Sequence, residues 1–201
     1  EGLEPDMLAK WPGFHRRLKW FLIYRPDLSA LVSRWDEPGA GQRHLLSLLR
    51  GHRMKRLLAR ALDESEFLSD YGVRALSKFH EANAFRFDFG GEQHVVSYLP
   101  GESDSYMFGG NSNWRGPIWM PVNVLIIRAL LNYHSYYGQN FTIECPTGSG
   151  NRMNLYQVAE EIARRLSAIF LRDVHGQRPV CGGSQKCQND PHWRDDLLFH
   201  E

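Results

Sequence analysis

The densest group of polar and aromatic side chains lies between residues 109 and 119, where the sequence reads Gly-Gly-Asn-Ser-Asn-Trp-Arg-Gly-Pro-Ile-Trp. Amide side chains donate and accept hydrogen bonds, as a hydroxyl-rich ligand requires. Trp114 and Trp119 offer flat apolar faces, and Arg115 offers a rigid fork of donors. The segment predicts a sugar-binding site lined by Asn113, Trp114, Arg115 and Trp119. The alternative is that both tryptophans belong to the core and Arg115 only satisfies loop carbonyls.

A second group mixes carboxylates, a histidine and a tryptophan between Asn189 and Asp196, and the chain then runs to Glu201. Glu201 follows an apolar segment, and a carboxylate is rarely buried there without a partner or a task. Glu201 is therefore a candidate catalytic residue. The alternative is an ordinary polar loop and helix start, because acidic residues such as Asp195 favour a helix N-terminus.

Metal chemistry is disfavoured. Cys181, Cys187, His192 and His200 could supply four ligands, but they lack the closely spaced cysteine pairs of structural zinc sites. The sequence contains no phosphate-binding loop, dinucleotide fingerprint or nucleophile elbow. We therefore expect neither a metal nor a cofactor.

The periodicity of apolar residues predicts the elements that carry these groups. Helices are expected over about 7–24, from about 54, over about 121–137 with Gly138 as C-cap, and after Asn154 as N-cap. The 121–137 segment is apolar nearly all round, which predicts burial on every side. Alternating aromatic residues and a Gly-Gly pair predict one β hairpin between about Phe85 and Leu99.

Charged residues on two of these helices have assignable roles. On the helix after Asn154, Glu160 with Arg164 and Glu161 with Arg165 are spaced for ion pairs on the outer face. The helix from about 54 is basic and can be interpreted as a phosphate-binding patch or as a solvated face. The near-neutral net charge favours the solvated face.

Composition narrows the classes of partner and compartment. The 201 residues carry 24 basic and 23 acidic side chains, a net charge of +1, so we expect neither a nucleic-acid nor a membrane partner. The three cysteines, an odd and low number, favour a reducing compartment over a disulfide framework and so a cytoplasmic location.

Four short segments together resemble glycoside hydrolase family 63, the family of processing α-glucosidases. They are 113–119, the Pro-Thr-Gly-Ser-Gly run at 146–150, the His-Trp-Arg-Asp run at 192–195, and Phe-His-Glu at 199–201. The resemblance extends from about Arg43 onward. It implies a mainly α fold, the (α/α)6 toroid of the six-hairpin glycosidases, here partial and with one small hairpin. Residues 1–201 would then form the C-terminal portion of a single catalytic domain.

The same resemblance implies an activity. It is that of an inverting α-glycosidase, α-glucosidase-like, acting on an oligosaccharide or small glycoside. Glu201 matches the family's general base, and Trp114 and Arg115, with Trp119, match its sugar pocket. The family's general acid, an aspartate, would precede this chain, so the chain alone is expected to be inactive. The alternative function is a non-catalytic carbohydrate-binding helical module or a scaffold.

Overall fold

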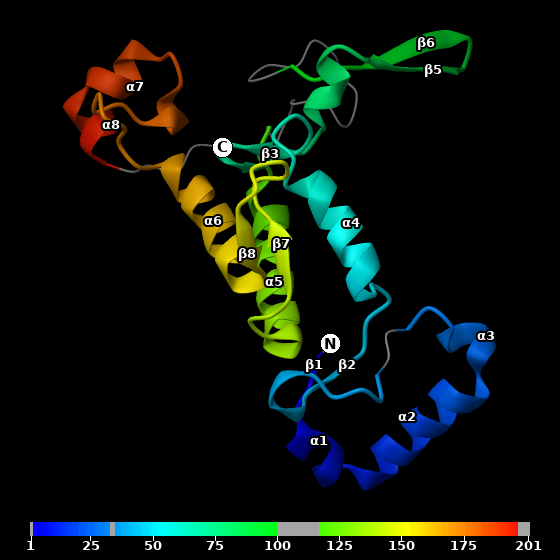
Figure 1. The fold of residues 1–201 in the computed structure, drawn as a ribbon. Coiled ribbons are helices and arrows are strands. Elements are labelled where there is room, and N and C mark those ends of the chain that lie inside the picture. The colour runs from blue at the N-terminus through cyan, green and yellow to red at the C-terminus, as the bar shows by residue number, and fades with distance from the viewer. Residues whose placement is uncertain (1, 33–34, 100–116, 197–201) are drawn as a thin grey trace.

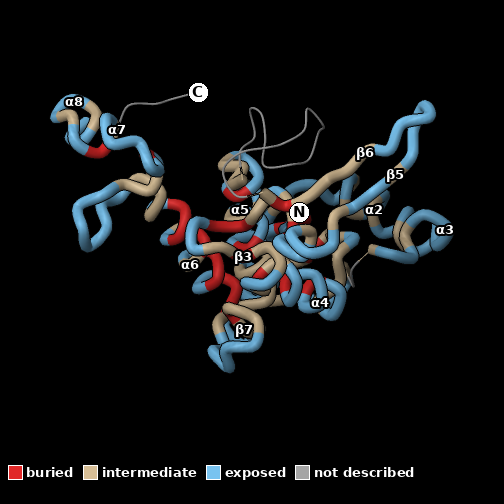
Figure 2. Tube along the Cα trace, turned by 90° about the horizontal axis from the view of Figure 1, so that it is seen from above, coloured by how far each residue is buried: buried red, intermediate tan, exposed pale blue. Residues whose placement is uncertain are grey.

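The computed structural model describes residues 2–32, 35–99 and 117–196 (Figure 1). A central body holds α4 (Gly51–Ala61), α5 (Met120–Tyr137) and α6 (Leu155–Ala168). An N-terminal helical arm, a protruding hairpin and a C-terminal lobe extend from this body (Figure 1). Most buried residues lie in the body, whereas the arm, the hairpin and the lobe are largely exposed (Figure 2).

The arm consists of α1 (Pro5–Lys10), α2 (Pro12–Tyr24) and α3 (Pro26–Ser29). Each helix begins with proline, whose fixed φ suits the first helical position and whose missing N–H would be unpaired there anyway. No residue of α2 is buried. Its aromatic side chains remain exposed, with Trp20 at 56% and Tyr24 at 66%.

The core forms where α4, α5 and α6 meet. Apolar positions at helical spacing supply it, as the periodicity predicted for α4 and α6. Its buried members are Met54, Leu58, Leu62, Leu68, Val73, Leu130, Ile143, Cys145, Leu155, Val158, Ala159, Ile162 and Leu166.

Helix α6 begins as the sequence predicted. The Asn154 side chain accepts from the Gln157 N–H at 3.0 Å, and the Gln157 side chain accepts from the Asn154 N–H at 2.9 Å. This capping box satisfies two otherwise unpaired N–H groups at the helix start. The predicted C-cap of α5 is also confirmed, because Gly138 follows Tyr137 with φ +68°.

The expectation that α5 is buried on every side is wrong. Only Asn123 and Leu130 of its residues are buried, and the side chain of Leu125 is 64% exposed. Within the described ranges α5 packs mainly against α6, so one flank of this apolar helix remains open to solvent.

Four two-stranded antiparallel sheets occur among the described residues. The hairpin β5 (Phe85–Phe89) with β6 (Glu92–Val96) confirms the one that the sequence predicted. The other pairs are β1 (Gly2–Leu3) with β2 (His44–Leu45), β3 (Leu68–Ser69) with β4 (Gly72–Val73), and β7 (Thr142–Glu144) with β8 (Arg152–Asn154).

The predicted fold class is therefore wrong. The described part of the chain mixes helices with four small sheets and is not a mainly α, partial (α/α)6 toroid. A toroid requires successive helical hairpins that pack against one another. Here strand pairs stand between α4, α5 and α6 in the chain, and no residue of α2 is buried.

The C-terminal lobe contains a 3-10 helix (Pro179–Cys181), α7 (Gln185–Asn189) and α8 (Pro191–Asp195). Two further 3-10 helices of the described residues span Ala40–Gln42 and Lys78–Glu81. Among the described residues, no helix has the length and apolar character to cross a membrane.

Candidate functional site

Most of the predicted sugar site lies outside the described residues. Asn113, Trp114, Arg115 and the candidate base Glu201 all fall there. Trp119 is described: it is half-buried and is the N-cap residue of α5. The structure therefore shows how the described end of this motif is held.

Asn123 holds that end. Its side chain is 1% exposed and lies one turn after Trp119. Its Nδ2 donates to the carbonyls of Trp119 and Val73 at 3.0 and 2.9 Å. Its Oδ1 accepts from the Val73 N–H at 2.8 Å. The amide thus joins the motif to β4 and satisfies buried backbone groups that would otherwise cost free energy.

Both described flanks of the 100–116 segment attach to the same few residues. On one side the Pro117 carbonyl accepts from the Ala75 N–H at 2.9 Å. On the other, the hydroxyl of Tyr98 accepts from Arg74 Nε at 3.2 Å. We call Val73–Ala75, together with Asn123, the platform. The platform therefore contacts both Tyr98 and Pro117, described residues on either side of that range.

The second predicted group is partly described and forms α8. Asp195 lies between two arginines, with oxygens 2.8 Å from Arg194 Nη2 and 2.6 Å from Arg172 Nη2. Hydrogen bonds from Arg194 and then Arg172 lower the pKa of Asp195 to about 2. Asp195 is therefore ionised at neutral pH, and its carboxylate forms ion pairs with both arginines.

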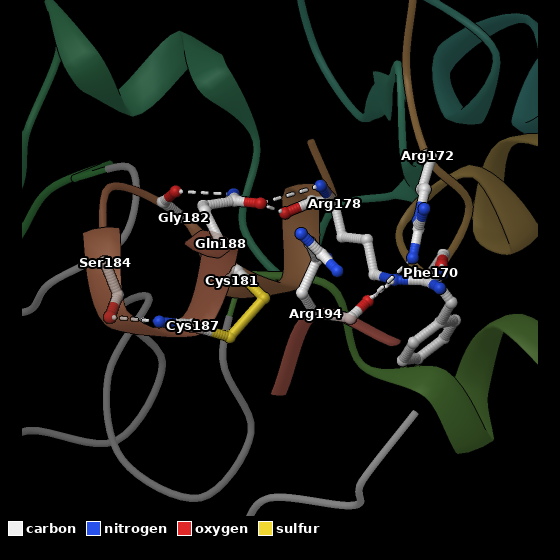
Figure 3. Close-up of a disulfide and its surroundings, with 9 residues drawn as sticks. All are labelled: Phe170, Arg172, Arg178, Cys181, Gly182, Ser184, Cys187, Gln188 and Arg194. Carbon is white, nitrogen blue, oxygen red and sulfur yellow. Dashed lines mark hydrogen bonds between the residues drawn. A yellow bond between two sulfur atoms is a disulfide. The ribbon is translucent and has the colours of Figure 1, made fainter. Parts of the chain in front are cut away.

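The lobe is closed around a disulfide between Cys181 and Cys187 (Figure 3). Beside it the buried Gln188 accepts from the Arg178 N–H at 3.0 Å and donates to the carbonyls of Arg178 and Gly182. The expectation that the cysteines are reduced is wrong for this pair. Cys145 is free and buried, and burial raises the pKa of its thiol to about 11.

The disulfide borders a cavity of about 350 Å³, which is lined by Val180, Cys181, Ser184, Lys186, Cys187 and Trp193.

The zinc alternative would have used the sulfurs of Cys181 and Cys187 as ligands. They are bonded to each other, so they cannot serve as thiolates. Over the described residues, no cluster of three or more histidine, cysteine or acidic side chains could hold a metal ion.

A buried ion pair lies on α6, where the sequence predicted an outer face. Arg165 is buried, and its guanidinium lies 2.7 Å from Glu161 and 3.0 Å from Glu64. It also donates to the Ser69 carbonyl at 2.9 Å. The predicted ion pair between Glu161 and Arg165 is confirmed. Glu161 also forms an ion pair with Arg164, for which the sequence had predicted Glu160 as the partner. Hydrogen bonds from Arg164 and Arg165 lower the pKa of Glu161 to about 2, against the opposing effect of burial.

A second cavity, of about 180 Å³, lies between α4 and the β7–β8 hairpin, and the sequence analysis missed it. It is lined by Lys55, Ala59, Thr142, Ile143, Glu144, Thr147 and Arg152. The basic character of α4 was the only indication of it in the sequence. The other wall comes from residues about ninety positions later, which no local pattern connects to α4.

Comparison with known proteins gives one relative of note. No family model and no solved structure matches the chain. The chain is 46% identical over 202 residues to the Saccharomyces cerevisiae protein named "Uncharacterized protein YMR196W". The alignment includes 99% of this chain and 19% of the yeast protein. The chain is thus similar to about a fifth of a much longer yeast protein.

Proposed function

We propose that this chain forms part of a carbohydrate-processing site in an inverting α-glycosidase that acts on an oligosaccharide or small glycoside. The observation that carries the proposal is the Trp-Arg-Gly-Pro-Ile-Trp element at 114–119, which combines aromatic faces with a fork of donors. The attachment of its described end supports a defined position, because Asn123 bonds the Trp119 carbonyl and Ala75 bonds the Pro117 carbonyl.

The proposed mechanism assigns Glu201 as general base. Its carboxylate takes a proton from water while that water attacks the anomeric carbon. A carboxylic acid outside residues 1–201 protonates the leaving oxygen from the opposite face of the sugar. Inversion requires these two carboxyl groups roughly 6.5–9.5 Å apart, so that the water fits between them. The 201 residues alone are then expected to turn over no glycoside.

The test uses the longest natural form of the protein with α-glucosides, followed by proton NMR of the first sugar released. Inversion from an α-linkage yields the β-anomer first. Glu201→Gln keeps the side chain's size but removes its basicity, so kcat should fall by about 10²–10⁴ while sugar binding persists. Glu160→Gln, an exposed change on α6, is the control. Near-normal turnover by the Glu201 variant contradicts the assignment.

The second candidate function is carbohydrate binding without turnover, from the same aromatic and arginine side chains. Isothermal titration of oligosaccharides separates the two functions, because a binding module retains affinity and releases no reducing sugar. A scaffold role predicts neither binding nor hydrolysis.

A cytoplasmic location is also part of this proposal. The low, odd number of cysteines supports it, whereas the Cys181–Cys187 disulfide counts against it because disulfides persist mainly in oxidising compartments. Fluorescence microscopy of the tagged natural protein decides between the two.

A further inference from the structure

The cavity between α4 and the β7–β8 hairpin is lined by two positively charged side chains, Arg152 and Lys55, whose nearest contacts are uncharged groups. Arg152, on β8, donates from Nη2 to the carbonyl and the hydroxyl oxygen of Thr142, at 2.8 and 3.0 Å. These two bonds fix the plane of the guanidinium. No carboxylate of the described residues lies within 4 Å of it, and Glu144, which lies opposite in the hairpin, attracts its positive charge only at longer range.

Lys55, on α4, supplies the second cation. Its Nζ lies 4.7 Å from the centroid of the Phe141 ring. A ring face attracts an ammonium group and orients it without cancelling its charge. As with Arg152, no acidic group in the described part of the chain forms an ion pair with Lys55.

Glu144 is the one carboxylate at the cavity, and the loop after β7 engages it. It lies opposite Arg152 in the hairpin register and accepts a hydrogen bond from the Gly150 N–H. Hydrogen bonds from the backbone N–H groups of Gly148 and Gly150 lower the pKa of Glu144, so it is ionised at neutral pH. Two cations and one carboxylate leave one net positive charge. Helix α4 contains no acidic residue that could offset this charge.

The loop that forms the cavity floor is attached to α4. The Thr147 hydroxyl donates to the Ala59 carbonyl at 2.7 Å, and the Thr147 N–H donates to the Leu62 carbonyl at 2.9 Å. Because these bonds join the loop to the helix, the backbone segments that carry Lys55 and Arg152 are held next to each other before any ligand arrives. Preorganised charges lose less conformational entropy on binding.

We propose that this cavity binds the phosphate group of a small phosphorylated ligand. A guanidinium offers paired donors that match phosphate oxygens, and an ammonium adds a compact point charge. The volume of about 180 Å³ equals about six waters at ~30 Å³ each, enough for a phosphate group and the first atoms attached to it. Lys55, Arg53 and Arg56 are all exposed, as the interpretation of α4 as a solvated face expects, and the proposal adds a ligand-binding role for Lys55 alone, because it lines the cavity.

The experiment titrates the chain with inorganic phosphate at constant ionic strength, with chloride as the reference salt. Binding is followed by isothermal titration and by amide NMR shifts. We expect saturable binding, with the largest shifts at Thr142, Thr147 and Arg152. Absence of saturable binding overturns the proposal, and so do shifts spread evenly along α4, which indicate diffuse charge screening.

Lys55→Met keeps the aliphatic stem and removes the charge, and Arg152→Gln removes the second cation. Each should weaken phosphate binding about tenfold, the effect of losing one charge-assisted contact. The control is Arg53→Gln, on α4 but outside the cavity lining, which should change affinity less than about twofold. If Arg152→Gln disturbs the hairpin, Lys55→Met decides alone, because no hydrogen bond of Lys55 to a described residue is lost. An Arg53 effect equal to that of Lys55 refutes the site.

Discussion

Replacing Glu161 with glutamine tests the buried ion pair on α6. Glu161 Oε1 lies 2.7 Å from both Arg165 Nε and Arg164 Nη2. The Arg165 side chain is 8% exposed, whereas its other acidic partner, Glu64, is 55% exposed. Glutamine preserves the shape and one acceptor oxygen but removes the charge. The variant therefore leaves a buried guanidinium that is compensated only by a solvent-exposed carboxylate.

The magnitude follows from the acidity of Glu161. Its pKa falls from the ordinary value of 4.5 to about 2. At about 1.4 kcal/mol for each tenfold change in acidity, the ionised form contributes on the order of 3 kcal/mol to folding. The folded pKa is the lower one, so this contribution is fully present above about pH 4.5. It is lost as pH falls toward 2, and more than half is gone near pH 3.

Urea unfolding of the wild type and of Glu161→Gln, followed by circular dichroism between pH 3 and pH 8, measures this difference. We expect Glu161→Gln to lower the free energy of unfolding by about 2–3 kcal/mol at pH 7 and by less than half of that at pH 3. The control is Glu160→Gln, because Glu160 is exposed and pairs with no described cation. A loss that is the same at both pH values refutes the electrostatic reasoning.

Three further predictions concern the platform, the neighbouring Gly72 and the cysteines. Asn123→Ala leaves the N–H and carbonyl of Val73 unpaired. It should therefore lower the free energy of unfolding, measured in thermal melts, by about 2–4 kcal/mol. The control is Asn132→Ala, an exposed change on the same helix, which should alter that free energy by less than ~0.5 kcal/mol. Gly72→Ala should destabilise by at least ~1 kcal/mol in the same assay, because φ is +114° and a Cβ would lie 2.8 Å from the Leu166 side chain; Gly183→Ala, with open space around it, is the control. A thiol reagent should label no cysteine in the native chain, Cys145 alone after denaturation, and all three cysteines after denaturation with reduction. Labelling of three cysteines in the denatured chain without reduction would contradict the disulfide.

The features that could be predicted from sequence are local. The start of α6 follows from Asn154 and Gln157, which are three residues apart, and the β5–β6 hairpin from aromatic alternation around Gly90-Gly91. Both features depend only on residues that are close together in the sequence, so a short segment is enough to predict each of them.

The features that sequence analysis missed depend on distant partners. The helical periodicity predicted that Arg165 lies on an outer face. In the structure its guanidinium instead donates hydrogen bonds to Glu64 and to the Ser69 carbonyl, about a hundred residues earlier in the chain. Asn123 stands on an apolar helix because Val73, fifty residues away, supplies two of its three backbone hydrogen bonds. Of the predicted sugar site, Trp119 alone is among the described residues, so the grouping of the site remains a prediction.

The difference in burial between α2 and α6 implies that their backbone amides differ in protection from hydrogen exchange. A helix of 13 residues with no buried side chain depends on its own propensity, and helices of about that length are marginal in water. Its amide protons should therefore exchange with deuterium nearly as fast as those of an unfolded peptide. Those of α6, whose Leu155, Val158 and Ile162 are fully buried, should exchange only on global unfolding. A probe attached to the arm would thus report local fraying and would not detect cooperative unfolding of the core.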